Sequence, residues 1–449
     1  MKRRNFLKKA TAGMLAMPAL VSNRIFARSG RPAPSDRITL GCIGLGGQGT
    51  WNMKGFLNNK EVQIIALCDV NKGSDDYDFL YQFPGTSTAG LANARNILET
   101  QYAEEIRSGI YKGCSTYTDF RELLSRDDID GVVVCTPDHW HGLVSKLAAE
   151  AGKDIYCEKP LTNTIAEGRA VCNAVNKYNR ILQTGSHERS NHSVAYACEL
   201  IYNGRIGKVH TVRVNMPVES QEDIPPQPVM PVPANLDYNM WLGPTPWYPY
   251  TKKRTHFWWR YILEYGGGEM TDRGAHIIDL GQLGLQMDHS GPVEISGKGW
   301  APKEGLFDTY MKFDFTCTYA NGVKLIGTSG GERGLKFEGT DGWIFIHIHG
   351  GRLEAQPESL LKEHIGPEEI HCRRSPGHHQ DFINSIKTRQ PAIAHEEIGH
   401  RTATICHLLN IAFQTERTLQ WDPVKEQIIN DETANRMLYR PMRAPWRLF

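Results

Sequence analysis

No apolar run in this chain of 449 residues approaches the roughly 18 residues that a membrane-spanning helix needs. An excess of one charge is also absent, since 51 Lys and Arg residues stand against 50 Asp and Glu residues. These absences argue against stable membrane insertion and against a polybasic protein that binds nucleic acid. The apolar share of 40% and the charged share of 22% are those of a globular protein, and the length suggests two sizeable domains.

The ten cysteines form no Cys-x-x-Cys pair and no Cys/His spacing typical of a zinc site. Four of them lie in or at the ends of apolar, strand-like runs, where a thiol acts as a small buried hydrophobe. They are Cys42, Cys68, Cys135 and Cys157. The spacing therefore predicts no cysteine-based metal centre and requires no disulfide.

The first 35 residues contain no acidic residue. Residues 3–8 (RRNFLK) place an arginine pair before Phe-Leu-Lys, and a mildly apolar stretch follows from Ala10 to Val21. This order is typical of a twin-arginine export signal. We therefore expect residues 1–35 to be a signal peptide and linker, read by the twin-arginine translocation machinery, and the protein to be periplasmic; a basic unstructured tail is the alternative. Cleavage after Ala27 would leave 45 basic against 50 acidic residues.

A buried strand, Ile38–Ile43, runs directly into a glycine-rich loop with the G-x-G-x-x-G spacing. The first glycine permits the tight turn, the second lets the backbone approach a pyrophosphate, and the third lets the next helix pack closely. Thr50–Leu57 suits that helix, and a second strand, Val62–Leu67, follows, so the loop has the context of a dinucleotide site. The predicted cofactor loop comprises Gly44, Gly46, Gly47, Gln48 and Gly49.

Asp69 follows the second strand and lies 20 residues beyond Gly49. A carboxylate at this place accepts hydrogen bonds from the adenosine ribose and repels a 2′-phosphate, so NAD is favoured over NADP. The alternative is that Asp69 only caps the next turn. Lys72 is close enough in sequence to weaken the discrimination.

Strands and helices continue to alternate up to Thr184, which predicts a doubly wound parallel sheet and a Rossmann domain over residues 36–185. The further strands are expected at Asp130–Cys135, Asp154–Cys157 and Ile181–Thr184, and the helices at Gly142–Ala151 and Thr164–Tyr178. Within the long insertion from Lys72 to Lys112, we expect a helix around Leu91–Ser108.

After Ser186 the pattern changes to longer strands in hairpins, with Ala320-Asn321-Gly322 as a clear hairpin turn. Residues 186–449 are thus predicted to form an α+β domain with a large, mostly antiparallel sheet. Nine of the 24 prolines lie between Pro217 and Pro249, which excludes regular helix or central strand there. The basic, aromatic tail, Leu438–Phe449, suggests a contact with a neighbouring subunit.

Three segments, together with the glycine loop, resemble the glucose–fructose oxidoreductase / inositol dehydrogenase / rhizopine-catabolism (Gfo/Idh/MocA) family. They are Thr136–His141 (TPDHWH), Glu158–Leu161 (EKPL) and Gly266–His276 (GGGEMTDRGAH). The resemblance is close to the exported members and covers nearly the whole chain after the first 35 residues. It implies a sugar oxidoreductase that forms a homo-oligomer, a dimer or a tetramer.

The resemblance implies three catalytic residues: Lys159, Asp272 and His276. Oxidation of a secondary alcohol needs a base for the proton, a cation for the developing alkoxide and a hydride acceptor. Lys159 follows the carboxyl end of a strand, where open α/β sheets bind ligands, and is implied to bond the substrate hydroxyl. His276 is implied to act as general acid/base, with Asp272 as its neighbour one helical turn earlier.

Further residues are expected around this centre, on the cofactor and the substrate side. The cofactor side comprises Thr136, Pro137, His141, Glu158, Lys159 and Gln183, and the substrate side Trp259, Arg260 and Asp279. A metal site is not expected, although Glu269, His139 and His141 are near enough in the motifs to complete one with Asp272 and His276. The His378-His379 pair and the alternation of His347 and His349 are interpreted as structural.

The sequence therefore predicts a periplasmic, NAD-dependent oxidoreductase that acts on a secondary hydroxyl of a sugar or glycoside. Because free NAD should be scarce outside the cytoplasm, the cofactor is expected to stay bound and to be regenerated in place. One alternative is a glycoside hydrolase or lyase that works by transient C3 oxidation and elimination. Another is a non-catalytic sugar-binding protein of the same fold.

Overall fold

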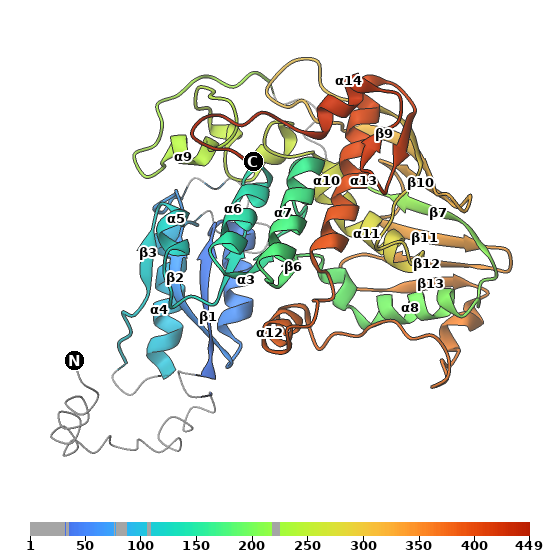
Figure 1. The fold of residues 1–449 in the computed structure, drawn as a ribbon, viewed down its shortest axis with the longest axis horizontal. Helices are drawn as coiled ribbons and strands as arrows, with labels where there is room; N and C mark the ends of the chain where they lie inside the picture. Colours follow the sequence, from blue (N-terminus) through green and yellow to red (C-terminus); the bar gives the residue numbers. More distant parts are fainter. Residues whose placement is uncertain (1–31, 33–35, 76, 78–87, 106–108, 218–224) are drawn as a thin grey trace, which may run out of the picture.

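The structure is a computed structural model that describes residues 32, 36–75, 77, 88–105, 109–217 and 225–449 (Figure 1). The predicted export signal therefore lies outside the described residues, except for Pro32. No helix in the described part is long and apolar enough to cross a lipid bilayer.

Six parallel strands form the first sheet, in the order β3-β2-β1-β4-β5-β6. The strands are β1 (Ile38–Ile43), β2 (Val62–Cys68), β3 (Ser115–Tyr117), β4 (Gly131–Val134), β5 (Asp154–Cys157) and β6 (Leu182–Thr184). Every residue of the central strands β4 and β5 is buried, because helices cover both faces. This is the predicted Rossmann order, and its strand order reverses between β1 and β4, where a crevice opens at the carboxyl ends.

Two groups of helices cover this sheet. One core face packs against α3 (Gly47–Leu57) and α4 (Leu91–Glu105), and the other against α5 (Phe120–Leu124), α6 (Asp138–Glu150) and α7 (Ile165–Lys177). The predicted helix in the insertion is confirmed as α4 over Leu91–Glu105, and the last three residues of the predicted span lie outside the described residues.

The second sheet has nine strands, in the order β13-β12-β11-β7-β10-β9-β8-β14-β15. All pairs are antiparallel except β10 with β7. Residues alternate between buried and exposed along β9, so one face is packed and the other is open. The strands are β7 (Val209–Asn215), β8 (Glu294–Trp300), β9 (Lys312–Thr318), β10 (Lys324–Thr328), β11 (Gly334–Gly339), β12 (Trp343–His347), β13 (Leu353–Gln356), β14 (Leu419–Asp422) and β15 (Gln427–Ile428).

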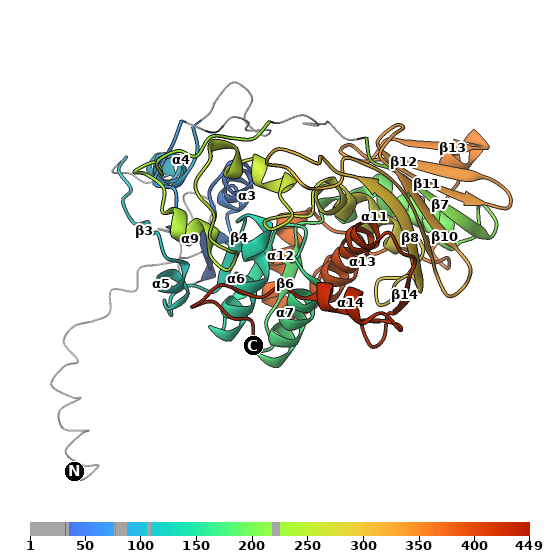
Figure 2. The same cartoon turned by 90° about the horizontal axis from the view of Figure 1, so that it is seen from above.

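The packed face of the nine-stranded sheet lies against helices that separate it from the Rossmann sheet (Figure 2). These helices are α8 (His192–Tyr202), α11 (Gly274–Gly284) and α13 (Glu396–Thr415). The predicted hairpin at Ala320-Asn321-Gly322 is confirmed, since β9 and β10 pair antiparallel across it. The α+β architecture of the second half is therefore as expected.

Two late segments of the chain return to the Rossmann sheet. Helix α12 (His378–Thr388) places Phe382 against Phe56, with 5.9 Å between their ring centroids. The tail places Trp446 against Trp140, with a centroid distance of 4.9 Å, and the chain end lies beside α6 in Figure 1. Trp446 thus packs against its own chain, whereas the other two aromatic residues of the tail, Tyr439 and Phe449, are exposed. The expected contact with a neighbouring subunit stays a prediction.

Residues 225–261, which we name the strap, cross from the second half over the Rossmann domain. The Lys72 amide donates to the Asn235 carbonyl at 2.9 Å, beside the end of β2. Further along, the His256 ring packs against Tyr77 with a centroid distance of 4.1 Å. As the prolines predicted, the strap is largely irregular and contains only short helical turns, such as α9 (Tyr238–Leu242) and η5 (Trp258–Tyr261).

Candidate active site

A cavity of about 660 Å³ lies between the crevice of the Rossmann sheet and the second half of the chain. Its size is that of a cofactor or substrate site. The glycine loop lies at one end, Lys159, Asp272 and His276 line another part, and the strap forms a wall. The cavity thus joins the predicted cofactor site and the predicted catalytic residues in one space.

The glycine loop has the close backbone contacts that its spacing predicts. Gly44 has a φ of +85°, and a Cβ on Gly49 would lie 1.9 Å from the Gly44 carbonyl oxygen. Helix α3 begins after Gly46, a residue with no side chain that could cap it, and its first residues, Gly47, Gln48 and Gly49, line the cavity. Such a helix N-terminus attracts phosphate oxygens.

Two alanine variants of this loop should fail in different ways. Gly49→Ala forces a backbone clash and should lower the free energy of unfolding by about 1–3 kcal/mol. A Cβ on Gly46 meets only Tyr77, at 3.5 Å, so Gly46→Ala should keep the stability of the wild type but bind NAD roughly 10–100-fold more weakly. Thermal unfolding and nucleotide titration measure the two effects, and Gly291→Ala, which has open space around it, is the control.

Asp69 lies at the end of β2 and lines the cavity, but its carboxylate also holds the local backbone. Oδ2 accepts from the Leu45 amide at 2.5 Å and Oδ1 from the Asn71 amide at 2.7 Å. Burial raises the pKa of Asp69 to about 6, although both hydrogen bonds oppose this. The local capping role of Asp69 is therefore confirmed, and its role in ribose binding stays a prediction.

The turn from β4 into α6 brings Thr136, Pro137 and His141 to the cavity. The two ring nitrogens of His141 lie 2.7 Å from the Pro160 carbonyl and 2.8 Å from the Thr136 carbonyl. His141 thus braces the two segments that carry Thr136 and Lys159. The buried Oγ1 of Thr136 has no hydrogen-bond partner in the described part of the chain, which leaves it available to a polar group of a cofactor.

Glu158 is a buried carboxylate that links the glycine loop to the predicted catalytic lysine. Its Oε1 accepts from Gln48 at 3.0 Å and from Asn52 at 2.8 Å. Although burial acts in the opposite direction, the nearby His187 and Lys159 hold the pKa of Glu158 well below its usual range. An ionised Glu158 therefore keeps Gln48 in place at the edge of the cavity.

Lys159 and Asp272 form an ion pair in the cavity wall, with Nζ bonded to Oδ1 of Asp272. Nζ also donates to the Asp272 carbonyl at 3.1 Å, and Arg260 Nε lies 3.7 Å from Oδ1. Burial would raise the pKa of Asp272, but the two cations, Lys159 first, hold it well below its usual range. Asp272 is therefore a fixed anion that positions the Lys159 ammonium group.

Asp272 and His276 lie on two consecutive short helices rather than on one. Helix α10 (Glu269–Asp272) ends before Arg273, and α11 begins at Gly274. The His276 amide still donates to the Arg273 carbonyl at 3.0 Å, so the turn is close to helical and both side chains line the cavity, as predicted.

The His276 imidazole is neutral at neutral pH. Burial first, then the proximity of Lys159 and His349, lowers its pKa well below the ordinary value of 6.5, against the pull of Asp272. Its Nδ1 is buried without a hydrogen-bond partner among the described residues. A neutral imidazole without an internal partner can take a proton from a ligand in the cavity.

Trp259 and Arg260, in η5, also line the cavity as predicted. The Arg260 guanidinium lies over the Trp259 ring, 4.5 Å from its centroid, and NH1 donates to the Phe257 carbonyl at 3.0 Å. This stacking holds the cation beside Asp272. The aromatic face and the guanidinium together suit the C–H face and the hydroxyls of a sugar.

Two predicted site residues do not line the cavity, so their predicted roles in cofactor and substrate binding are corrected. Gln183 is fully buried in β6, and its amide donates to the His378 carbonyl at 2.7 Å. Asp279 lies one turn beyond His276, where it forms a buried ion pair with Arg189 at 2.7 Å. Both side chains are used to join parts of the fold that are distant in sequence.

The sequence reasoning missed several polar residues of the cavity. They are Asp138, His187, Glu188, His256 and His349. Asp138 belongs to the TPDHWH motif and could have been included with its neighbours; burial raises its pKa well above the usual range, although Arg260 and Lys159 oppose this. His349 was interpreted as structural, and no signal in the sequence links it to the site.

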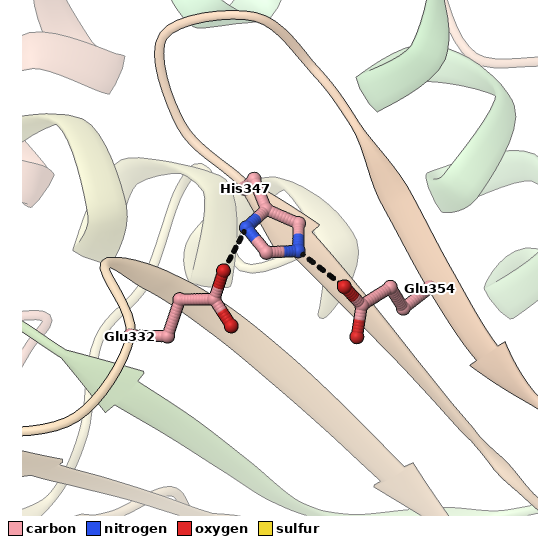
Figure 3. Close-up of side chains that lie close together, drawn as sticks. All are labelled: Glu332, His347 and Glu354. Atoms are coloured by element: carbon pink, nitrogen blue, oxygen red, sulfur yellow. Dashed lines mark hydrogen bonds and ion pairs between the residues drawn. The ribbon is translucent and has the colours of Figure 1, made fainter.

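Glu269 and His139 do not complete a metal site with Asp272 and His276. Glu269 pairs with Arg273 at 2.7 Å, and His139 bonds the Trp241 carbonyl. In the described part of the chain, one group has three potential metal ligands, and it lies elsewhere, at the edge of the nine-stranded sheet (Figure 3). The group consists of Glu332, His347 and Glu354.

In that group each imidazole nitrogen of His347 faces a different carboxylate (Figure 3). Nδ1 lies 3.2 Å from Glu332 and Nε2 3.0 Å from Glu354. Arg352 also pairs with both carboxylates, at 2.9 and 3.1 Å. Opposite ring nitrogens cannot ligate one ion, and a cation is already present, so the arrangement is that of an ion-pair network.

Comparisons with known proteins agree with this geometry. Residues 81–186 match the family model "Oxidoreductase family, NAD-binding Rossmann fold", and residues 218–448 match "Oxidoreductase family, C-terminal alpha/beta domain", both of the Gfo/Idh/MocA family. The second match alone covers just over half of the chain.

Relatives of this chain include an uncharacterized oxidoreductase, YrbE, of Bacillus subtilis (strain 168), 33% identical over 214 residues, or 46% of this chain and 51% of that protein. A glycosyl hydrolase family 109 protein of Shewanella sp. (strain W3-18-1) is 29% identical over 181 residues, 37% of this chain and 35% of that protein. The chain thus spans about half or less of these curated relatives.

Among solved structures, aldose-aldose oxidoreductase from Caulobacter crescentus, complexed with glycerol, aligns with a TM-score of 0.60. The alignment covers 86% of this chain and 99% of that one at 18% identity, so it establishes likeness of fold. With the Rossmann sheet, the nine-stranded sheet and both family models in agreement, the chain belongs to the Gfo/Idh/MocA oxidoreductase family.

Proposed function

We propose that the protein is an NAD-dependent oxidoreductase that acts on a secondary hydroxyl of a sugar or glycoside. The observation that carries the proposal is the single cavity that joins the glycine loop to Lys159, Asp272 and His276. Bound NAD would supply the hydride acceptor. The uncapped N-terminus of α3, the orphan Oγ1 of Thr136 and the carboxylate of Asp69 fit its phosphates and its polar groups.

The residues of this chain would bind the sugar, stabilise the developing charge and accept the proton. The Lys159 ammonium donates a hydrogen bond to the substrate oxygen and favours the developing negative charge there. The neutral His276 takes the hydroxyl proton. Asp272 keeps the ammonium group in place, and Trp259 and Arg260 offer a stacking face and donors to the rest of the sugar.

We infer further that the cofactor stays bound through many turnovers. The strap crosses the Rossmann domain beside Asp69, where the Lys72 amide donates a hydrogen bond to the Asn235 carbonyl. The packed rings of Tyr77 and His256 line the same cavity as the glycine loop. A nucleotide below these contacts leaves only when they open. Retention suits an exported enzyme that oxidises one sugar and reduces another on the same nucleotide.

Export through the twin-arginine route to the periplasm is part of the proposal and is supported by the residues 3–8 pattern alone. Fractionation of cells that express the wild type and an Arg3→Lys/Arg4→Lys variant tests it. The wild type should be periplasmic and the variant should remain in the cytoplasm.

A homo-oligomer is also proposed, and light scattering of the purified protein tests it.

The choice of NAD over NADP rests on Asp69. Because its carboxylate lies on the cavity wall at the end of β2, it should repel a 2′-phosphate. Asp69→Ser should therefore lower the affinity for NAD and raise the affinity for NADP, with a change in their ratio of roughly 10–100-fold. Fluorescence titration with both nucleotides measures the ratio, and an unchanged ratio would leave Asp69 with its capping role only.

The test of the proposed function is a single-turnover reaction. Protein loaded with NAD is mixed with a panel of methyl glycosides and myo-inositol, and absorbance at about 340 nm is followed beside product NMR. NADH formation with a keto sugar as product supports the proposal. Release of the free aglycone without net NADH would instead identify hydrolysis, and unchanged sugars would identify a binding protein.

A further inference from the structure

A second imidazole–carboxylate pair lies in the cavity and has no part in the proposed hydride transfer. It consists of His349, in the turn between β12 and β13, and Glu188, in η3 (His187–Ser190). The His349 Nδ1 lies 3.4 Å from Glu188 Oε1. The pair joins an edge of the nine-stranded sheet to the segment just after the Rossmann domain, so the full fold is needed to form it.

The pair is held more rigidly than a surface contact. The same Glu188 oxygen also accepts the His349 backbone amide, at 2.8 Å. His349 has a φ of +62°, a left-handed conformation that a non-glycine residue adopts at a cost, and Glu188 is buried. The fold thus fixes both the backbone and the ring of His349 beside the cavity.

The ring of His349 faces the predicted base. The centroids of His349 and His276 are 5.5 Å apart at an interplanar angle of 79°. Nδ1 faces Glu188, so Nε2 is the other polar atom of a side chain that is 41% exposed on the cavity wall. The neighbouring His187 is engaged by the Tyr156 hydroxyl at 3.1 Å and by Glu158 at 3.5 Å.

We propose that His349, clamped by Glu188, binds a hydroxyl adjacent to the one that Lys159 and His276 act on, so that the preferred ligand is a ring with a vicinal diol. Hydrogen bonds span about 2.7–3.2 Å, and two imidazoles at this separation reach neighbouring hydroxyl oxygens of one sugar ring. The inference rests on the proposed function for the class of ligand, but the contact itself does not depend on catalysis.

Binding is therefore measured apart from turnover. Protein loaded with NADH, which cannot oxidise a sugar, is titrated calorimetrically with methyl β-D-glucopyranoside, methyl β-D-galactopyranoside and myo-inositol. The tightest ligand is then compared with its monodeoxy analogues in the wild type, His349→Asn and Glu188→Gln. Asparagine tolerates the left-handed conformation, so the first variant should fold, and His364→Gln, on the exposed surface, is the control.

The wild type and the control should bind one monodeoxy analogue roughly 10–100-fold more weakly than the parent sugar. His349→Asn should bind the parent sugar and the analogue with the same affinity. In Glu188→Gln the ratio of the two affinities should lie between those of the wild type and His349→Asn. The inference is overturned if His349→Asn discriminates as the wild type does, or if no sugar of the panel binds.

The companion single-turnover reaction keeps the two proposals apart. Discrimination through His349 without any NADH formation would overturn the proposed function and leave this inference standing. If NADH forms but His349→Asn still discriminates between the parent sugar and its analogue, the proposed function stands and this inference is overturned.

Discussion

Replacement of Lys159 by methionine should slow single-turnover NADH formation about 10³-fold. The ammonium group is held by the Asp272 side chain and carbonyl on the cavity wall, so methionine removes the cation that favours the alkoxide while keeping the length of the side chain. Bound NAD should remain at the level of the wild type, because the glycine loop is unaffected. Stopped-flow absorbance and nucleotide analysis by HPLC measure the two quantities.

The variant also leaves Asp272 buried with Arg260 as its remaining close cation, at 3.7 Å. Because Lys159 is the largest contribution that lowers the pKa of Asp272, that pKa should rise in the variant. A depressed carboxyl pKa stabilises the fold above the unfolded-state pKa, and this stabilisation is lost as the pH falls, so Lys159→Met should lower the free energy of unfolding at neutral pH.

A double variant separates catalysis from folding. Lys159→Met/Asp272→Asn removes the unpaired charge and should recover much of the stability, but none of the activity. Lys146→Met is a matched control, because Lys146 also forms a partly buried ion pair, with Glu150 in α6, but does not line the cavity, and this variant should behave as the wild type. If Lys159→Met kept the full rate of hydride transfer, Lys159 would be a structural lysine.

The sequence predicted the fold in detail because local patterns determine it. Strand Ile38–Ile43, the glycine spacing and the turn at Asn321-Gly322 each have a geometric cause within a few neighbouring residues. Lys159, Asp272 and His276 could be placed in the cavity because each belongs to a motif. The exact break between α10 and α11 at Arg273 is a detail that spacing could not reveal.

The errors arose where the partner of a side chain is distant in sequence. Asp279 has the helical spacing of a site residue, but Arg189, 90 positions earlier, binds it in the interior. Gln183 lies next to the last residue of a strand at the ligand-binding edge, but its side-chain amide donates to the carbonyl of His378, 195 positions later. His349 was missed for the same reason, since only the nine-stranded sheet brings it to His276.

His276→Asn should slow hydride transfer by about 10²–10⁴-fold, because asparagine cannot accept the hydroxyl proton. The pH dependence of the wild type gives a sharper expectation. Burial, Lys159, His349 and His187 lower the pKa of His276, and Asp272 opposes them, so the pKa of the base lies well below its ordinary value of 6.5. The value of kcat/KM should therefore be independent of pH through neutral pH and should fall only below pH 6.5.

His349→Asn tests the cause of that shift, because it removes one of the neighbouring groups that lower the pKa of His276. The acid limb of kcat/KM should then move to higher pH, while Glu188 is left without its imidazole partner. Profiles of the wild type, His349→Asn and His364→Gln between about pH 4.5 and 9 measure the movement. An acid limb above pH 6.5 in the wild type would mean that another group accepts the proton, since a base with a lowered pKa cannot lose activity by protonation there.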